Sequence, residues 1–99
     1  MADDQDRDYV RLAEDALDSL YDKYAEADDA GKWMLKPAIT KAAEELLSAR
    51  LALFREGTLT TQEDIDALIK LKNEIDQAAN AQAAVLAAIK LAAMLGVFA

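Results

Sequence analysis

Residues 77–99 read QAANAQAAVLAAIKLAAMLGVFA and contain a single charged side chain, Lys90. From Ala83 to Ile89 no side chain is polar. A helix that is apolar on all sides is expected to be buried on all sides. This segment therefore decides the fold, because the rest of the chain must surround it or leave it for another molecule to cover.

The chain around this segment is short and rich in helix-forming residues. It has 99 residues, of which 22 are Ala and 14 are Leu, and its helix breakers are three glycines and Pro37. A chain of this length forms one domain. No run alternates apolar and polar residues, so strands are not expected. We predict an all-α protein, a three-helix bundle that forms a single domain over residues 1–99, with helices at about 4–30, 37–56 and 61–95.

The first two predicted helices follow from apolar spacing and from the helix breakers. Gly31 is expected to end the first helix in a left-handed cap, and Gly57 is expected to end the second helix. Pro37 suits the first turn of the second helix, and Trp33 is expected to fold over one end of the bundle. The apolar residues of the first helix alternate spacings of three and four, as in helical bundles: Val10, Ala13, Leu17, Leu20, Tyr24 and Ala27.

The third predicted helix is unusually long. Thr60 followed by Glu63 is the pattern of a capping box, and nothing interrupts the helix until about residue 95. The short link before it predicts an antiparallel hairpin of the second and third helices. A helix over 61–95 would be about 52 Å long, whereas a compact domain of this size is roughly 33 Å across. Its C-terminal half should therefore protrude.

Self-association is the favoured interpretation of a protruding apolar helix. Small residues spaced four apart let helices approach closely, and bulkier neighbours fill the interface. We expect residues 77–99 to act as an oligomerisation segment of a homodimer or higher oligomer, with Gln82 either fixing the register or facing solvent. The residues expected in the contact are Ala79, Ala83, Val85, Leu86, Ile89, Ala92 and Met94.

The apolar segment is also compatible with a membrane or with burial inside a monomer. Residues 81–99 approach the length of a membrane span, but Lys90 in the middle of the span would cost about 2.5 kcal/mol or more. A membrane-associated helical protein is therefore the less favoured alternative. The segment could instead be covered by the chain's own first helix, which would give a monomer.

The charge of the chain is concentrated in its first thirty residues. These residues hold eleven acidic and three basic side chains, which accounts for the whole net charge of −8. Four of the acidic residues recur at near-helical spacing and form what we call the acidic ridge: Asp15, Asp18, Asp22 and Glu26. Such a ridge is either a solvated helix face or a surface that attracts a basic protein.

The composition argues against catalysis and against several kinds of ligand. The chain has no His and no Cys, so it lacks the commonest general base and the usual ligands of transition metals. We expect no catalytic residues, no metal and no cofactor. Basic residues are too scattered for direct binding of nucleic acid. No signal-peptide pattern follows the N-terminus, and we expect a cytoplasmic protein.

These observations favour a non-catalytic interaction or assembly module, a small structural or adaptor protein that self-associates through its C-terminal helix. The first alternative is a small acidic inhibitor of the kind that phages encode. Such a protein would imitate nucleic acid and block a basic partner that handles it. The two alternatives differ in salt dependence, because binding through exposed charges weakens as the ionic strength rises.

Overall fold

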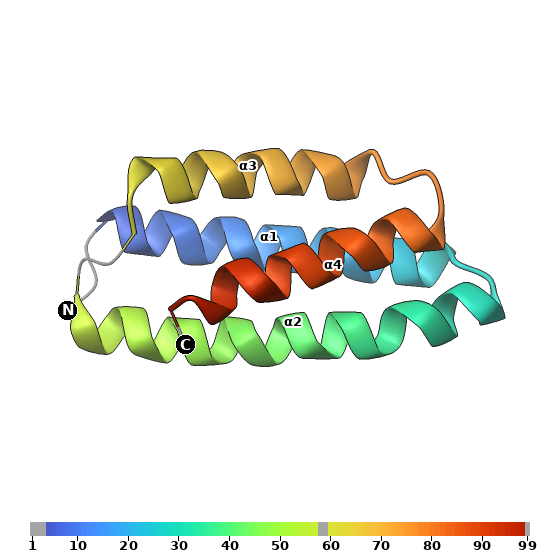
Figure 1. The fold of residues 1–99 in the computed structure, drawn as a ribbon, viewed down its shortest axis with the longest axis horizontal. Helices are drawn as coiled ribbons and strands as arrows, with labels where there is room; N and C mark the ends of the chain where they lie inside the picture. Colours follow the sequence, from blue (N-terminus) through green and yellow to red (C-terminus); the bar gives the residue numbers. More distant parts are fainter. Residues whose placement is uncertain (1–3, 58–59, 99) are drawn as a thin grey trace.

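The computed structural model describes residues 4–57 and 60–98, and within these ranges it contains four helices and no strand. The helices are α1 (Asp4–Glu26), α2 (Asp29–Glu56), α3 (Gln62–Asp76) and α4 (Ala81–Gly96). They form an elongated bundle of 42 × 21 × 16 Å (Figure 1). The prediction of an all-α bundle is confirmed, but the predicted number of three helices is wrong.

The helices are arranged so that α2 and α3 lie on opposite sides of the bundle. Figure 1 shows α1 and α3 running in one direction and α2 and α4 in the other. Both α2 and α3 pack against α1 and α4, but within the described ranges they do not contact each other. The predicted antiparallel hairpin of these two helices is therefore wrong.

Thr60, which precedes α3, is held at the N-terminal end of α1, and this contact accounts for the difference. The buried carboxylate of Asp6 in α1 accepts a hydrogen bond from the Thr60 amide at 3.0 Å and a second one from the Thr60 hydroxyl. These bonds hold Thr60 against α1, so that α3 starts beside α1 rather than beside α2. A short link by itself does not make its two helices neighbours.

The long helix predicted over 61–95 is broken between Asp76 and Ala81. Asn80 caps α4, and its Oδ1 accepts a hydrogen bond from the Ala83 amide at 2.8 Å. The break lets α4 turn back and pack along α2 and α3. The apolar residues that were expected to protrude are instead largely buried within the chain: Ala84, Ala87, Ala88, Leu91, Ala92 and Leu95.

The boundary between the first two helices also differs from the prediction. The chain turns at Asp28, which caps α2 by accepting a hydrogen bond from the Gly31 amide at 2.7 Å. Gly31 does not end a helix but lies buried in the first turn of α2. A Cβ at Gly31 would lie 3.1 Å from the Cβ of Ala81, so this glycine lets α4 begin close to α2.

Because α2 begins at Asp29, Pro37 lies inside the helix instead of in its first turn. Trp33 is 84% exposed, so the expectation that it folds over one end of the bundle is wrong. The predicted end of the helix at Gly57 is confirmed. Gly57 has a φ of 93°, and its amide donates to the Leu53 carbonyl. Such a positive φ favours glycine.

A capping box opens α3, one residue later than predicted. Thr61 Oγ1 accepts a hydrogen bond from the Asp64 amide, and the Asp64 carboxylate accepts one from the Thr61 amide. Thr60 is not the cap, because its amide and its hydroxyl are turned towards Asp6 and donate to it. The prediction of a capping box is therefore correct, but the box lies at Thr61 and Asp64 instead of Thr60 and Glu63.

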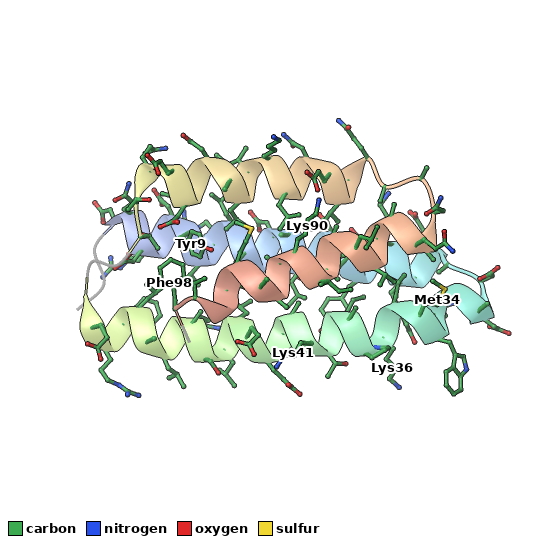
Figure 2. The ribbon with its side chains drawn as sticks, viewed as in Figure 1. Tyr9, Met34, Lys36, Lys41, Lys90 and Phe98 are labelled. Carbon is green, nitrogen blue, oxygen red and sulfur yellow. The ribbon has the colours of Figure 1, made fainter. Side chains whose placement is uncertain are left out.

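The core runs the length of the bundle and is closed at one end by aromatic contact. Tyr9 in α1 and Phe98 after α4 meet edge to face, with ring centroids 5.2 Å apart (Figure 2). This contact fastens the chain beyond α4 to the N-terminal part of α1. The largest fully buried apolar side chains come from all four helices: Tyr9, Leu20, Leu35, Leu53, Leu68, Ile75, Leu91 and Leu95.

The Asn80 cap gives a first testable prediction. We expect Asn80→Ala to lower the free energy of unfolding by about 1 kcal/mol, because the Ala83 amide loses its partner and Ala favours a helix that continues from α3. Asn80→Asp should retain most of the stability, since Asp also caps helices. Urea unfolding followed by circular dichroism measures both changes. Equal stability of the Ala variant and the parent chain would contradict the role of the cap.

The burial of Tyr9 gives a second prediction. Removal from water, with a smaller contribution from the nearby Asp64 charge, raises the pKa of Tyr9 from 10.0 to about 12. In the unfolded chain the phenol ionises near pH 10, whereas in the folded chain it stays neutral up to about pH 12. The stability is therefore full below pH 10 and falls as the pH rises towards 12, by up to about 2–3 kcal/mol.

Denaturant unfolding between pH 9 and pH 12 measures this loss. Tyr9→Phe is the matched control, because it keeps the ring beside Phe98 and removes the ionisable group. The variant should lose less stability over this range than the parent chain. Identical pH profiles would show that the alkaline loss comes from other groups.

Candidate functional site

The seven residues predicted for an oligomer contact do not share one environment. Leu86 and Ile89 are 62% and 54% exposed, and Ala79 is exposed in the loop before α4. Ala92 is buried inside the bundle. The remaining three are half-buried where α4 meets its neighbours: Ala83, Val85 and Met94.

The outward side of α4 nevertheless carries a continuous apolar surface, which we call the α4 face: Leu86, Ile89, Ala93 and Val97. Val97 is 78% exposed, and Ala93 is exposed as well. Lys90 lies at the edge of this face and turns towards α3, where its Nζ is 3.2 Å from a Glu74 oxygen (Figure 2). The centre of the α4 face therefore carries no charge.

The acidic ridge lies on the solvent side of α1. All four of its carboxylates are exposed, and none takes part in an ion pair recorded for residues 4–57 and 60–98. Asp18 and Asp22 lie one turn apart near its middle. The ridge thus presents its charge to solvent, where it can act on a second molecule.

A third surface, on α2, was not predicted as a site. Trp33, Leu47, Leu51 and Phe54 are 84%, 60%, 55% and 44% exposed. A signal is present in the sequence, because Trp33, Thr40, Leu47 and Phe54 are each seven residues apart. It was obscured because the expected helix began at Pro37, which left Trp33 outside it.

Two adjacent hollows lie between α1 and α2 at the Trp33 end of this surface. The larger has a volume of about 490 Å³ and is lined by Tyr24, Lys32, Trp33, Lys36 and Pro37. The smaller, of about 190 Å³, shares Tyr24 and Lys36 with the first and adds Tyr21, Ile39 and Thr40. The Lys32 Nζ lies 5.9 Å from the centroid of the Tyr24 ring. The hollows therefore combine aromatic rings with two lysines.

The remaining electrostatic contacts stabilise the helices. Lys72 and Ser19 donate hydrogen bonds to the Asp76 carboxylate, which lowers the pKa of this group. The Glu45 carboxylate accepts a hydrogen bond from Lys41, one turn away, and raises the pKa of that ammonium group. These pairs lie outside the three surfaces, and their charges are neutralised by neighbouring side chains.

In the part of the chain that the structure describes, no cluster of three or more acidic, His or Cys side chains could hold a metal ion. None of the helices there has the length and hydropathy needed to cross a membrane. Comparison of the chain with protein families, with curated proteins and with solved structures gives no match.

Proposed function

We propose that the protein is a non-catalytic helical interaction module, of a structural or adaptor kind, which self-associates through the α4 face. The observation that carries the proposal is the exposure of Leu86, Ile89 and Val97 around an uncharged centre. A contiguous apolar patch on a soluble domain commonly marks a site of protein association. Packing of two α4 faces would cover these side chains in both copies.

The size of the face predicts a weak association. Burying the exposed part of one such side chain contributes about 1 kcal/mol, so three side chains on each of two copies contribute about 6 kcal/mol. The loss of translational and rotational freedom costs roughly 4–15 kcal/mol. Because this balance falls short of the roughly 4 kcal/mol that a millimolar dimer needs, dimerisation requires further contacts around the face, such as the half-buried Val85 and Met94.

Molar mass in solution tests this proposal. We expect light scattering to show a rise from 10.8 kDa towards twice that mass as the concentration increases to the millimolar range. The double variant Leu86→Glu and Ile89→Glu should remain a monomer, because dimerisation would bury four charges without partners.

The matched control places the same change on another helix. Ile69 on α3 is 44% exposed, so Ile69→Glu adds a charge at an exposed apolar position outside the α4 face. This variant should associate like the parent chain. A parent chain that stays a monomer at all concentrations, or an equal loss in the Ile69 variant, would refute the proposal.

A second candidate function rests on the acidic ridge. Its four exposed carboxylates support the role of an inhibitor that occupies the nucleic-acid site of a basic protein. In this role α1 would present its charges in place of phosphates. No apolar contact is required, so the interaction should depend strongly on salt.

Competition with DNA tests the second candidate. A labelled duplex bound to core histones has high fluorescence anisotropy, and displacement of the DNA lowers it. We expect the chain to lower the anisotropy at low salt, and the double variant Asp18→Lys and Asp22→Lys to lose this effect. Displacement that persists in this variant, or that does not weaken with salt, would exclude a mechanism based on the ridge.

A further inference from the structure

Helix α2 is apolar on two sides, and residues 4–57 and 60–98 cover only one of them. The inner side packs against α1 and α4 and includes Leu35, Leu46 and Leu53, all buried. The other side carries what we call the outer stripe: Trp33, Thr40, Leu47, Leu51 and Phe54. A solvated helix face is normally polar, so a second apolar side on the same helix indicates a further partner.

The spacing of the outer stripe fits a helical partner. Residues seven apart on an α-helix differ by about 20° in direction, so Trp33, Thr40, Leu47 and Phe54 follow one side of α2 with a drift of about 60° in all. The stripe runs from Trp33 to Phe54, a rise of about 31 Å along the helix. A stripe of this length and slow drift matches the seam along which an amphipathic helix packs at a shallow angle on α2.

The hollows next to Trp33 provide an anchor at one end of the stripe. They contain the rings of Tyr24 and Trp33 together with Pro37, and a bulky side chain of the partner could enter there. Binding energy in protein interfaces is concentrated in such filled pockets, and Trp and Tyr are enriched among the residues that supply it. An aromatic or large aliphatic residue near one end of the partner helix fits this position.

The charges beside the outer stripe favour an acidic partner. Lys36, Arg50 and Arg55 are exposed along α2, and none of them forms an ion pair recorded among the described residues. Figure 2 shows Lys36 projecting from α2 on the side away from α4. Glu44 is the acidic residue nearest the middle of the stripe. Glu or Asp beside the apolar positions of the partner would pair with the three basic residues.

A second copy of the chain fits this surface poorly. Two α2 helices packed antiparallel, with Leu47 against the Leu51 of the other copy, would bring the two Arg50 side chains within one helical turn of each other. Like charges at such a distance oppose association. The acidic α1 of a second copy presents Tyr21 as its one large exposed apolar residue, so it could not fill the stripe.

We propose that the outer stripe of α2 is the docking site for an amphipathic helix of another protein, about 20 residues long and flanked by acidic residues. This inference goes beyond self-association. The hollows open between α1 and α2, whereas the α4 face lies on a different helix, so both surfaces can be occupied at once. The module would thus join copies of itself through α4 and hold a partner through α2.

Trp33 provides a direct readout, because it is the only tryptophan in the chain and lies at one end of the stripe. The probe is a synthetic 21-residue helical peptide without Trp, with Leu at alternating spacings of three and four, Phe near one end, and Glu beside the Leu positions. A matched peptide has Lys in place of every Glu. Titration calorimetry gives the affinities, and fluorescence reports the surroundings of Trp33.

We expect the acidic peptide to shift Trp33 emission to shorter wavelength and to bind at least tenfold more tightly than the basic peptide. Leu51→Glu should weaken this binding at least tenfold. The double variant Arg50→Glu and Arg55→Glu should reverse the preference between the peptides. Ile69→Glu on α3 is the control and should leave peptide binding unchanged, and circular dichroism verifies that each variant is folded.

Equal affinity for the two peptides, or no binding of the acidic peptide at 1 mM, would overturn the proposal. Unchanged affinity in a folded Leu51→Glu variant would also overturn it. Light scattering on the same samples shows independently whether the chain self-associates, so the failure of one proposal can be told from the failure of the other. If Leu51→Glu instead dissociates a dimer of the parent chain, the stripe is covered by a second copy and the docking of a foreign helix is refuted.

Discussion

Ala84, Ala87 and Ala88 are buried only because the chain reverses direction between Asp76 and Ala81. The side chain of Asn80 accepts a hydrogen bond from the Ala83 amide. This N-cap fixes the residue at which α4 begins. Once reversed, α4 covers the inner side of α2. Without this turn the most apolar helix of the chain would extend into water, and α2 would have apolar side chains exposed on both of its sides.

Close packing of α4 on α2 depends on small residues on both helices. Gly31 admits Ala81 at the start of the contact, and a Cβ at Gly96 would lie 3.3 Å from a Glu45 oxygen at its far end. Alanines fill the interface between these two points. Because alanine side chains are small, the backbones of α2 and α4 approach closely. Dispersion contacts then form between the two helices without large side chains.

Apolar periodicity was sufficient to predict the class of the fold and most of the core, because it reflects which side of a helix avoids water. Val10, Ala13 and Leu20 were placed correctly in this way. Periodicity could not locate the break before α4, since the residues from Gln77 to Asn80 include neither Gly nor Pro and Asn is also tolerated within helices. Pro37 led to the opposite error, because α2 begins at Asp29 and continues through the proline.

The functional surfaces were predictable only where charge or exposure is encoded locally, as in the acidic ridge, which follows from spacing along α1 alone. The contact residues on α4 could not be separated into exposed and buried ones, because that division depends on how α4 packs against α2 and α3.

The position of α4 late in the chain has a consequence for folding during synthesis. The inner side of α2 packs only in part against α1 and cannot be fully covered until residues 81–96 have emerged. The first three helices therefore exist for a time with an open apolar channel between them. Partly assembled domains of this kind are prone to aggregation. Helix α1 carries a high negative charge and emerges before α4. Repulsion between neighbouring nascent chains would therefore keep their open apolar channels from touching one another until α4 packs into place.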